Sequence, residues 1–164
     1  DVVGFSSIAK LKDDFVVVGG LTTNIDAADK DKKTEAVLIR YDKDGNIKYE
    51  KYYRVNKSAR YNKVLVDGSN IVAIGHTAKK DEKESTDSYN VFRYSGLFAK
   101  YKEDGEEITK KNEKGSRDIY FSDIKKKKNG YLIVGQTSSK ELGGNNKDLI
   151  SYFLKYDKNG KIIK

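Results

Sequence analysis

The chain of 164 residues contains no cysteine, and it has a single histidine, His76. Without cysteine there is no disulfide framework and no thiolate ligand for a metal. One imidazole alone does not make a typical zinc site, and no serine or cysteine motif near His76 offers a nucleophile for it to activate. We therefore predict a structural role for His76, no catalytic residues, and neither a metal nor a cofactor.

Proline, methionine and tryptophan are also absent. Without proline, the abundant lysine is left to protect exposed strand edges from pairing with other chains. No apolar run approaches the roughly 18 residues of a membrane-spanning helix, so we expect no transmembrane segment. There is no secretory signal, but methionine is missing even at position 1. The sequence is therefore expected to be an internal piece of a longer protein, whose targeting segments could have been removed.

A short apolar run closed by glycine occurs three times. The copies are Phe15-Val16-Val17-Val18-Gly19, Ile71-Val72-Ala73-Ile74-Gly75 and Tyr131-Leu132-Ile133-Val134-Gly135. Continuous apolar runs of this length indicate strands that are buried on both faces. Upstream of each run stand an aromatic residue and then an aliphatic one, in the pairs Phe5 and Ile8, Tyr61 and Val64, and Phe121 and Ile124.

Downstream of each apolar run, a tyrosine leads into a polar turn closed by glycine at Gly45, Gly105 and Gly160. Subtraction gives periods of 56 and 60 for the first set of glycines (19, 75, 135) and of 60 and 55 for the second (45, 105, 160). Such periods indicate one supersecondary unit per repeat. We predict a single repeat domain over 1–164, with units at about 1–59, 60–117 and 118–164.

Each unit is expected to hold four strands. In the first unit they fall near 5–11, 15–22, 36–41 and 46–54, and the third unit ends partway through its fourth strand. The loops between second and third strands, at 24–35, 78–95 and 138–148, vary most. Variable loops on a constant scaffold are where binding usually resides, although tolerated length is the plainer explanation.

Two all-β architectures accommodate three four-stranded antiparallel units: a β-propeller-type stack of blades, and a β-trefoil. Blades lie between neighbours, so their middle strands are covered on both sides, which suits Val16-Val17-Val18 and Leu132-Ile133-Val134. We therefore predict propeller-type blades, with the trefoil as the alternative. Because propellers use about four to eight blades, three blades leave two bare faces. Either the parent chain supplies missing blades or two copies complete a ring.

The third unit carries the pattern most fully, in Phe121-Ser122-Asp123-Ile124, in 129–137 and in Lys155-Tyr156-Asp157-Lys158-Asn159-Gly160. This pattern resembles the bacterial β-propeller repeats of secreted and surface proteins, and weaker copies extend the resemblance over nearly the whole chain. It departs from the family in the fourth strand, which usually carries a tryptophan; here that role would fall to Tyr49 and Tyr52. The resemblance implies a non-catalytic scaffold that is extracellular or at the cell surface, and no particular ligand.

Charge is unevenly distributed in this chain of formal net charge +8. Residues 48–63 contain six basic residues and one acidic residue, and residues 125–128 are all lysine. This positive charge would attract an anionic polymer, but the sequence contains no recognised nucleic-acid-binding module. We therefore expect that the lysines serve solubility and that the chain binds no specific nucleic acid.

Asp42-Lys43-Asp44-Gly45 resembles part of a calcium loop, yet it lacks the further ligands and is better explained as a turn.

The loops and the connections between units should emerge at one end of the sheets. Four residues at the unit entrances on that end are candidate ligand-binding residues: Arg60, Tyr61, Arg117 and Tyr120. Planar donors and aromatic platforms suit sugars or acidic side chains. The alternative is that the aromatic residues only pack there.

Three functions remain open. The first is a non-catalytic binding or scaffolding module of a bacterial protein, which contacts a protein or glycan through the loop-rich end. The second is a fragment of a propeller-fold glycan hydrolase that uses loop carboxylates. Such enzymes need two opposed acids, whereas the acids at 81, 82, 84 and 87 crowd a single loop that reads as solvated. The third is a structural spacer without a ligand.

Overall fold

Strands dominate the computed structural model, which describes residues 1–23, 33–55, 57–86 and 90–163. The first unit holds β1 (Val2–Leu11), β2 (Asp14–Thr23), β3 (Lys33–Tyr41) and β4 (Ile47–Tyr53). The second holds β5 (Ser58–Asp67), β6 (Asn70–Lys80), β7 (Phe92–Lys102) and β8 (Glu107–Glu113). The third holds β9 (Ile119–Lys127), β10 (Gly130–Thr137), β11 (Ile150–Tyr156) and β12 (Ile162–Ile163), with one short 3-10 helix, η1 (Lys140–Leu142).

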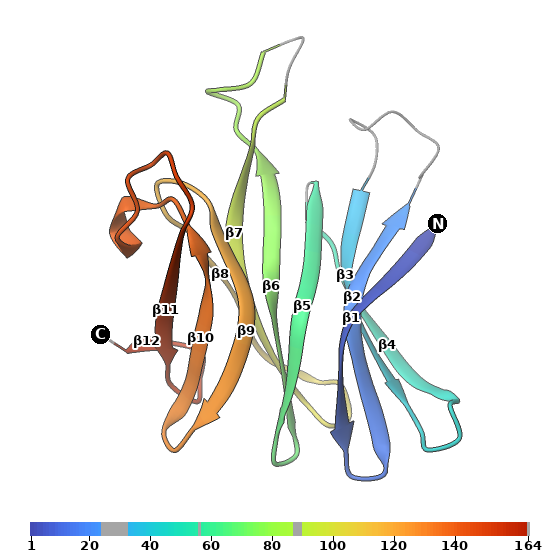
Figure 1. The fold of residues 1–164 in the computed structure, drawn as a ribbon. Coiled ribbons are helices and arrows are strands. Elements are labelled where there is room, and N and C mark those ends of the chain that lie inside the picture. The colour runs from blue at the N-terminus through green and yellow to red at the C-terminus, as the bar shows by residue number, and fades with distance from the viewer. Residues whose placement is uncertain (24–32, 56, 87–89, 164) are drawn as a thin grey trace.

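Within each unit, consecutive strands pair antiparallel in a four-stranded meander. The units stand side by side in chain order, and the described parts of the loops after β6 and β10 lie at the upper end of Figure 1. Among the described residues, a single parallel bridge, between Thr34 and Ser58, joins the sheet of the first unit to that of the second. Neither strand order closes on itself. The described strands therefore form open sheets and not the closed barrel that a β-trefoil requires.

The polar turns between third and fourth strands follow from one aspartate and one glycine each. The Asp42 carboxylate accepts hydrogen bonds from the backbone N–H groups of Asp44 and Asn46, both at 2.9 Å. Gly45 has φ 89°, and Gly105 and Gly160 repeat this left-handed conformation, which is strained for other residues. Because the turn itself uses the Asp42 oxygens, this segment is the predicted turn.

The glycine that closes each apolar run has a packing reason. The first strand of each unit has a register irregularity opposite this glycine. A Cβ on Gly19, Gly75 or Gly135 would lie 2.1, 1.9 or 1.8 Å from a carbonyl oxygen of that neighbouring strand. Only glycine leaves room for so close an approach of two backbones.

Two apolar cores lie between the three sheets. One core combines residues of the first and second units, including Val18, Leu38, Tyr61 and Tyr101. The other combines residues of the second and third units, including Phe98, Phe121 and Tyr156. Each sheet therefore contributes a face to a neighbour, and the second sheet contributes both faces.

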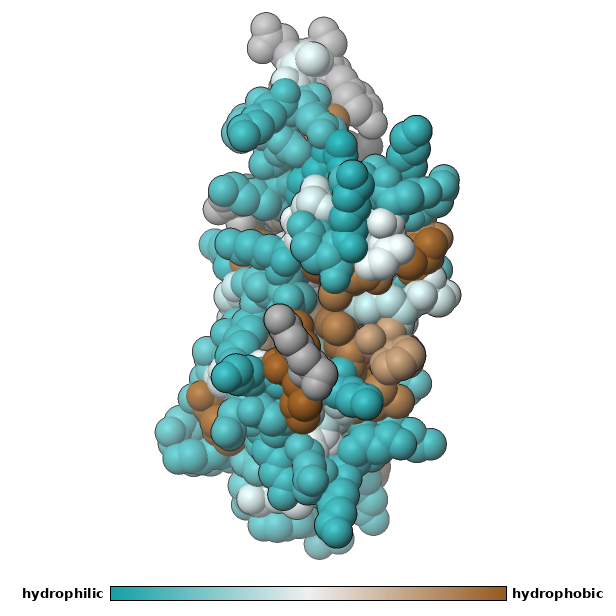
Figure 2. Space-filling model, turned by 90° about the vertical axis from the view of Figure 1, so that its left-hand side faces the viewer, coloured by the Kyte–Doolittle hydropathy of each residue, from teal (hydrophilic) through white to brown (hydrophobic). Residues whose placement is uncertain are grey.

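The prediction that every middle strand is covered on both sides is right only for the second unit. In β6, residues 71–75 are all buried. In the outer units, one face of the middle strand is open: Phe15 in β2 and Val134 in β10 are exposed. The physical reason is that the first unit has a described neighbour only on one side, and so does the third. Figure 2 looks onto the third unit, where apolar side chains gather among polar ones.

Candidate binding surface

The loop-rich end collects the described parts of the segments after β6 and β10, together with the connections from β4 to β5 and from β8 to β9 (Figure 1). In the second unit, β6 extends to Lys80 and β7 begins at Phe92, so the strands reach further into the expected loop 78–95 than the sequence indicated. Most of the first loop, residues 24–32, lies outside the described residues. The site is therefore built from the second and third units.

Arg60 and Tyr61 both lie on β5, but their environments differ. The Arg60 guanidinium donates to the Gly4 carbonyl oxygen at 3.2 Å and to Ser6 Oγ at 3.1 Å, so it links β5 to β1. Tyr61 is only 1% exposed, and its hydroxyl pairs with that of Tyr101 at 2.8 Å. Burial raises the pKa of Tyr61 well above its usual value. Tyr61 therefore packs in the core, which is the alternative to ligand binding that the sequence analysis named for the aromatic residues.

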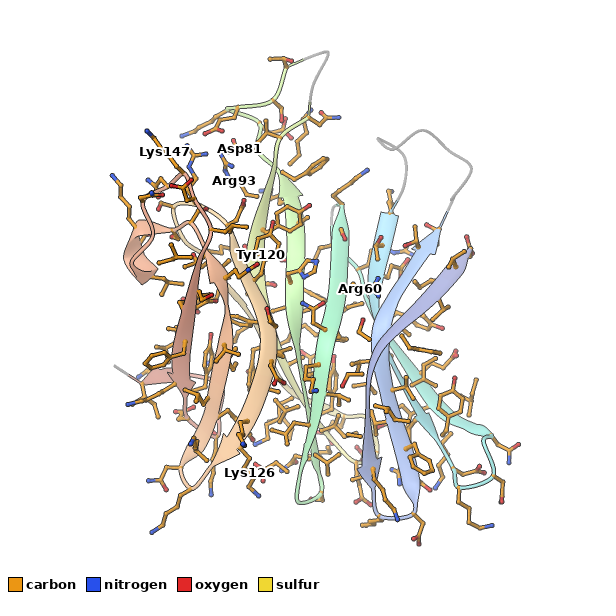
Figure 3. All side chains as sticks on the ribbon, in the orientation of Figure 1. Arg60, Asp81, Arg93, Tyr120, Lys126 and Lys147 are labelled. Atoms are coloured by element: carbon orange, nitrogen blue, oxygen red, sulfur yellow. The ribbon has the colours of Figure 1, made fainter. Side chains whose placement is uncertain are left out.

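Tyr120 belongs to an aromatic cluster with His76 and Tyr94. Its ring centroid lies 5.5 Å from that of His76 and 4.8 Å from that of Tyr94. Burial, helped by the nearby Asp118 charge, raises the pKa of Tyr120. Arg60 on β5 is the register partner of His76 on β6, and Tyr120 lies on β9 of the third unit, so both lie near this cluster (Figure 3).

His76 has the structural environment that the sequence predicted. Asn62 Nδ2 lies 3.2 Å from His76 Nδ1 and also donates to the Phe121 carbonyl oxygen at 2.7 Å. Burial, with a contribution from the Arg60 charge, lowers the pKa of His76. The imidazole is therefore neutral near pH 7 and joins the second unit to the third.

Arg117 takes part in a different arrangement, a cluster of ion pairs. Its Nη1 lies 2.8 Å from Glu84 Oε1, and Glu84 also contacts Arg93. Arg93 Nε in turn lies 2.9 Å from Asp81 Oδ2. Of the four loop carboxylates that the sequence analysis treats as solvated, Asp81 and Glu84 are therefore bound to two arginines, one from β7 and one from the connection to the third unit.

Beside this cluster the surface is hollowed by about 550 Å³ at the loop-rich end. The lining has bases and no acid, and its residues are Arg54, Val55, Thr77, Ala78, Lys79, Arg93, Tyr94, Ser95, Asn112, Lys114, Gly115 and Arg117. We call this hollow the basic pocket. Tyr94 lines it and also belongs to the aromatic cluster, so the two features adjoin.

Of the four predicted site residues, the basic pocket includes Arg117 alone. Arg60 and Tyr120 lie by the adjoining aromatic cluster, and Tyr61 lies in the core. Sequence reasoning missed Arg54, Lys79, Arg93 and Lys114. The signal available was the density of bases in 48–63 and in the 111–117 connection, but nothing in the sequence tells which of them share a surface.

The pocket offers electrostatic and hydrogen-bonding contacts to anionic oxygens. Among the described residues, no group of three or more histidine, cysteine, aspartate or glutamate side chains is placed to hold a metal ion. No helix in the described part of the chain is long and apolar enough to cross a membrane.

Comparison with known proteins finds no relative: no protein-family model matches the chain, and no curated protein matches it significantly.

Proposed function

We propose that this chain is a non-catalytic binding or scaffolding module of a bacterial secreted or cell-surface protein, which contacts a protein or glycan through its loop-rich end. In this proposal the three sheets are blades of a β-propeller-type stack. What supports the stack is that consecutive meanders pack face to face across two cores, without closing a barrel. The bacterial, extracellular setting rests on the repeat pattern.

The basic pocket is the observation that carries the binding function. Five cationic side chains line it, and they come from the end of β4, from β6, from β7 and from the connection after β8. Three of them already have acidic partners: Arg54 with Glu35, and Arg93 and Arg117 with Glu84. The favoured ligand is therefore one whose carboxylate or sulfate groups contact several bases at once.

The hydrolase alternative has no observation in its favour. Two carboxylates facing one another across a cleft would be needed. Asp81 and Glu84 are instead engaged by Arg93 and Arg117. A spacer without ligand remains the outcome if the pocket binds nothing.

Calorimetric titration tests the proposal with three probes: an oligogalacturonate, a polyglutamate peptide, and a neutral maltooligosaccharide. We expect saturable binding of an acidic probe that weakens as salt is raised. Arg117→Ala should weaken it by about tenfold, which corresponds to 1.4 kcal/mol. Arg60→Ala should weaken it less, because that guanidinium is held by Gly4 and Ser6.

The matched control is Lys161→Ala, which removes one exposed positive charge from the turn end of the third unit. It lowers the net charge as much as Arg117→Ala does, but it should leave binding unchanged. Equal weakening in both variants would mean attraction by net charge alone. Absence of saturable binding to all three probes would contradict the proposal.

A further inference from the structure

The bare face of the first unit carries the residues that the other two units use for packing. Phe5 and Ile8 are 49% and 63% exposed. Their equivalents by the repeat offsets, Tyr61 and Val64 in the second unit and Phe121 and Ile124 in the third, are buried in the two cores. In those units each such face lies against the preceding sheet. The first unit thus displays a packing face on which no described sheet is seated.

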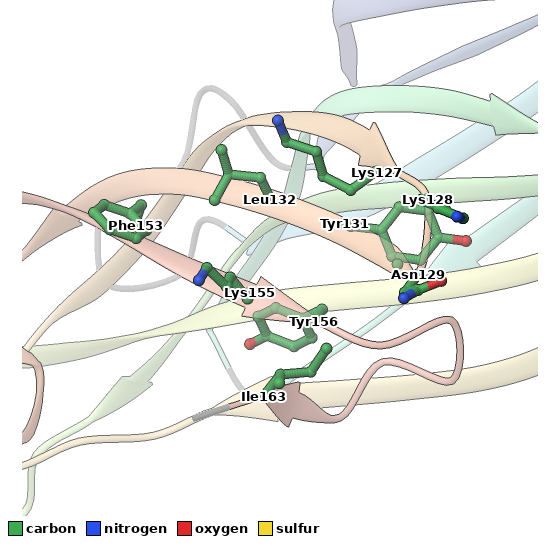
Figure 4. Close-up of a pocket in the computed structure, with 10 residues that line it drawn as sticks. Lys127, Lys128, Asn129, Tyr131, Leu132, Phe153, Lys155, Tyr156 and Ile163 are labelled. Carbon is green, nitrogen blue, oxygen red and sulfur yellow. The ribbon is translucent and has the colours of Figure 1, made fainter.

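The bare face of the third unit is the complementary one. Phe153 and Val134 are 63% and 41% exposed. Their equivalents, Phe98 and Ile74 in the second unit and Leu38 and Val18 in the first, are fully buried against the following sheet. Phe153 lines one open hollow on this face together with Leu132, Lys155 and Ile163 (Figure 4).

The seat for such an aromatic ring is present on the first unit. Phe98 stacks on Tyr156 with centroids 5.3 Å apart, approaches Tyr131 at 5.9 Å, and lies over Gly160. The equivalents of these three contacts are Tyr41, Phe15 and Gly45. All three line one hollow of about 350 Å³ on the bare face of the first unit.

A polar contact also recurs at the turn end of the two internal interfaces. The Arg40 guanidinium of the first unit donates to the Glu103 carbonyl oxygen in the turn of the second. Lys100 Nζ of the second unit donates to the Lys158 carbonyl oxygen in the turn of the third, at 2.8 Å. By the repeat offsets, the donor position of Arg40 and Lys100 corresponds to the exposed Lys155 in the third unit. The acceptor position of Glu103 and Lys158 corresponds to Lys43 in the turn of the first unit.

We infer that a second copy of this chain docks here, with the third unit of one copy packed on the first unit of the other. Phe153 enters the hollow formed by Phe15, Tyr41 and Gly45, and Lys155 Nζ donates to the Lys43 carbonyl oxygen. The contact continues the series of interfaces within the chain.

Two copies can satisfy both of their bare faces at once. The contact joins different faces, so it is heterologous, and heterologous contacts close into rings when the rotation allows. Two copies of three units make six, which lies within the range of known propellers. This inference rests on the propeller-type stack proposed above, but not on any ligand of the basic pocket.

Sedimentation velocity over a concentration series tests the docking with the chain alone. We expect a species of twice the 18.6 kDa monomer mass. Phe153→Asp and Ile8→Asp should each raise the apparent Kd for association at least about thirtyfold, as burying a charge at an interface centre does. Because both side chains are exposed in the monomer, circular dichroism should be unchanged. Ile108→Asp, an exposed apolar position on neither bare face, should associate like the unchanged chain.

Mixing the two defective variants gives the decisive result. One keeps an intact first face and the other an intact third face, so a mixture should form dimers through one contact although neither variant associates alone. A mixture that stays monomeric, or a loss of association in only one of the two variants, would overturn the heterologous contact. A chain that is monomeric at every concentration would overturn the docking itself, and masses that keep growing would overturn the two-copy ring. None of these outcomes bears on whether the basic pocket binds an acidic probe.

Discussion

The second unit and the two outer units have nearly the same sequence pattern, yet they differ in how much of it is buried. Phe98, in the third strand of the second unit, is fully buried between two sheets. Phe153 occupies the same position in the third unit and is among the most exposed apolar side chains. The difference shows that burial in a stack of repeats depends on position in the series, because each unit covers only its neighbours.

The largest effect expected from this comparison is on stability at the two equivalent phenylalanines. Phe98→Ala should lower the free energy of unfolding by about 3–5 kcal/mol, because it leaves a cavity between Tyr131 and Tyr156. Phe153→Ala should change it by less than about 0.5 kcal/mol in dilute solution. Urea unfolding at low protein concentration measures both. Equal losses would mean that the two positions are not differently covered.

A smaller effect is expected at the buried tyrosine pair. Tyr101→Phe leaves the Tyr61 hydroxyl without its partner in the core, and should cost about 1–3 kcal/mol. Tyr41→Phe changes the equivalent residue on the bare face, where water can solvate polar groups, and should cost under about 0.5 kcal/mol. Thermal unfolding of the two variants at one pH makes the comparison. A loss in Tyr41→Phe as large as that in Tyr101→Phe would contradict it.

Acid should weaken the joint between the second and third units. The hydrogen bond from Lys126, and then one from Tyr131, hold the pKa of Asp67 below its usual 3.8. The stabilisation is therefore full above pH 3.8 and is lost as the pH falls through the lower pKa of the folded state. Asp67→Asn should flatten the fall in unfolding free energy below about pH 4. A variant that loses stability in acid as steeply as the unchanged chain would exclude Asp67 from this role.

The smallest effect concerns His76, whose equivalents in the outer units are Gly20 and Gln136. Its pKa is below the usual 6.5, mainly because it is buried. The unfolded chain therefore takes up the proton first, so stability should decline as the pH falls through 6.5 toward the folded-state pKa. His76→Gln, which installs the residue of the third unit, should remove that decline between about pH 7 and 5. A decline that persists in the variant would have another origin.

The local sequence pattern predicted where most of the strands lie, but it did not predict which faces of the strands are covered by a neighbouring sheet. The apolar runs and glycine-closed turns placed β2 and β4 within a residue or two of 15–22 and 46–54. The turn at Asp42 was predicted as a turn because its chemistry is local. Two-sided burial of Phe15 and Val134 was predicted wrongly, because a strand's sequence does not say whether a neighbouring sheet is present.

The candidate site was predictable only in part, for a similar reason. The unit entrances pointed to Arg117 and to the loop-rich end, but Tyr61 lies inward on its strand, and alternation alone does not say which side is covered. Arg93 and Lys79 were missed because they lie within extensions of β6 and β7 that were read as loop. Pairing of Glu84 with Arg93 and also with Arg117, which is 33 residues away in the sequence, is a property of the tertiary arrangement.

Hydroxyl-radical footprinting tests most directly whether equivalent residues differ by position in the series. It is best done on Phe153→Asp, which the docking inference keeps monomeric. In this variant we predict rapid oxidation of Phe5 and Phe15 on the bare face and protection of Phe98 and Phe121 between the sheets. Oxidation of Phe98 and Phe121 as fast as that of Phe5 and Phe15 would contradict the serial packing of the three sheets.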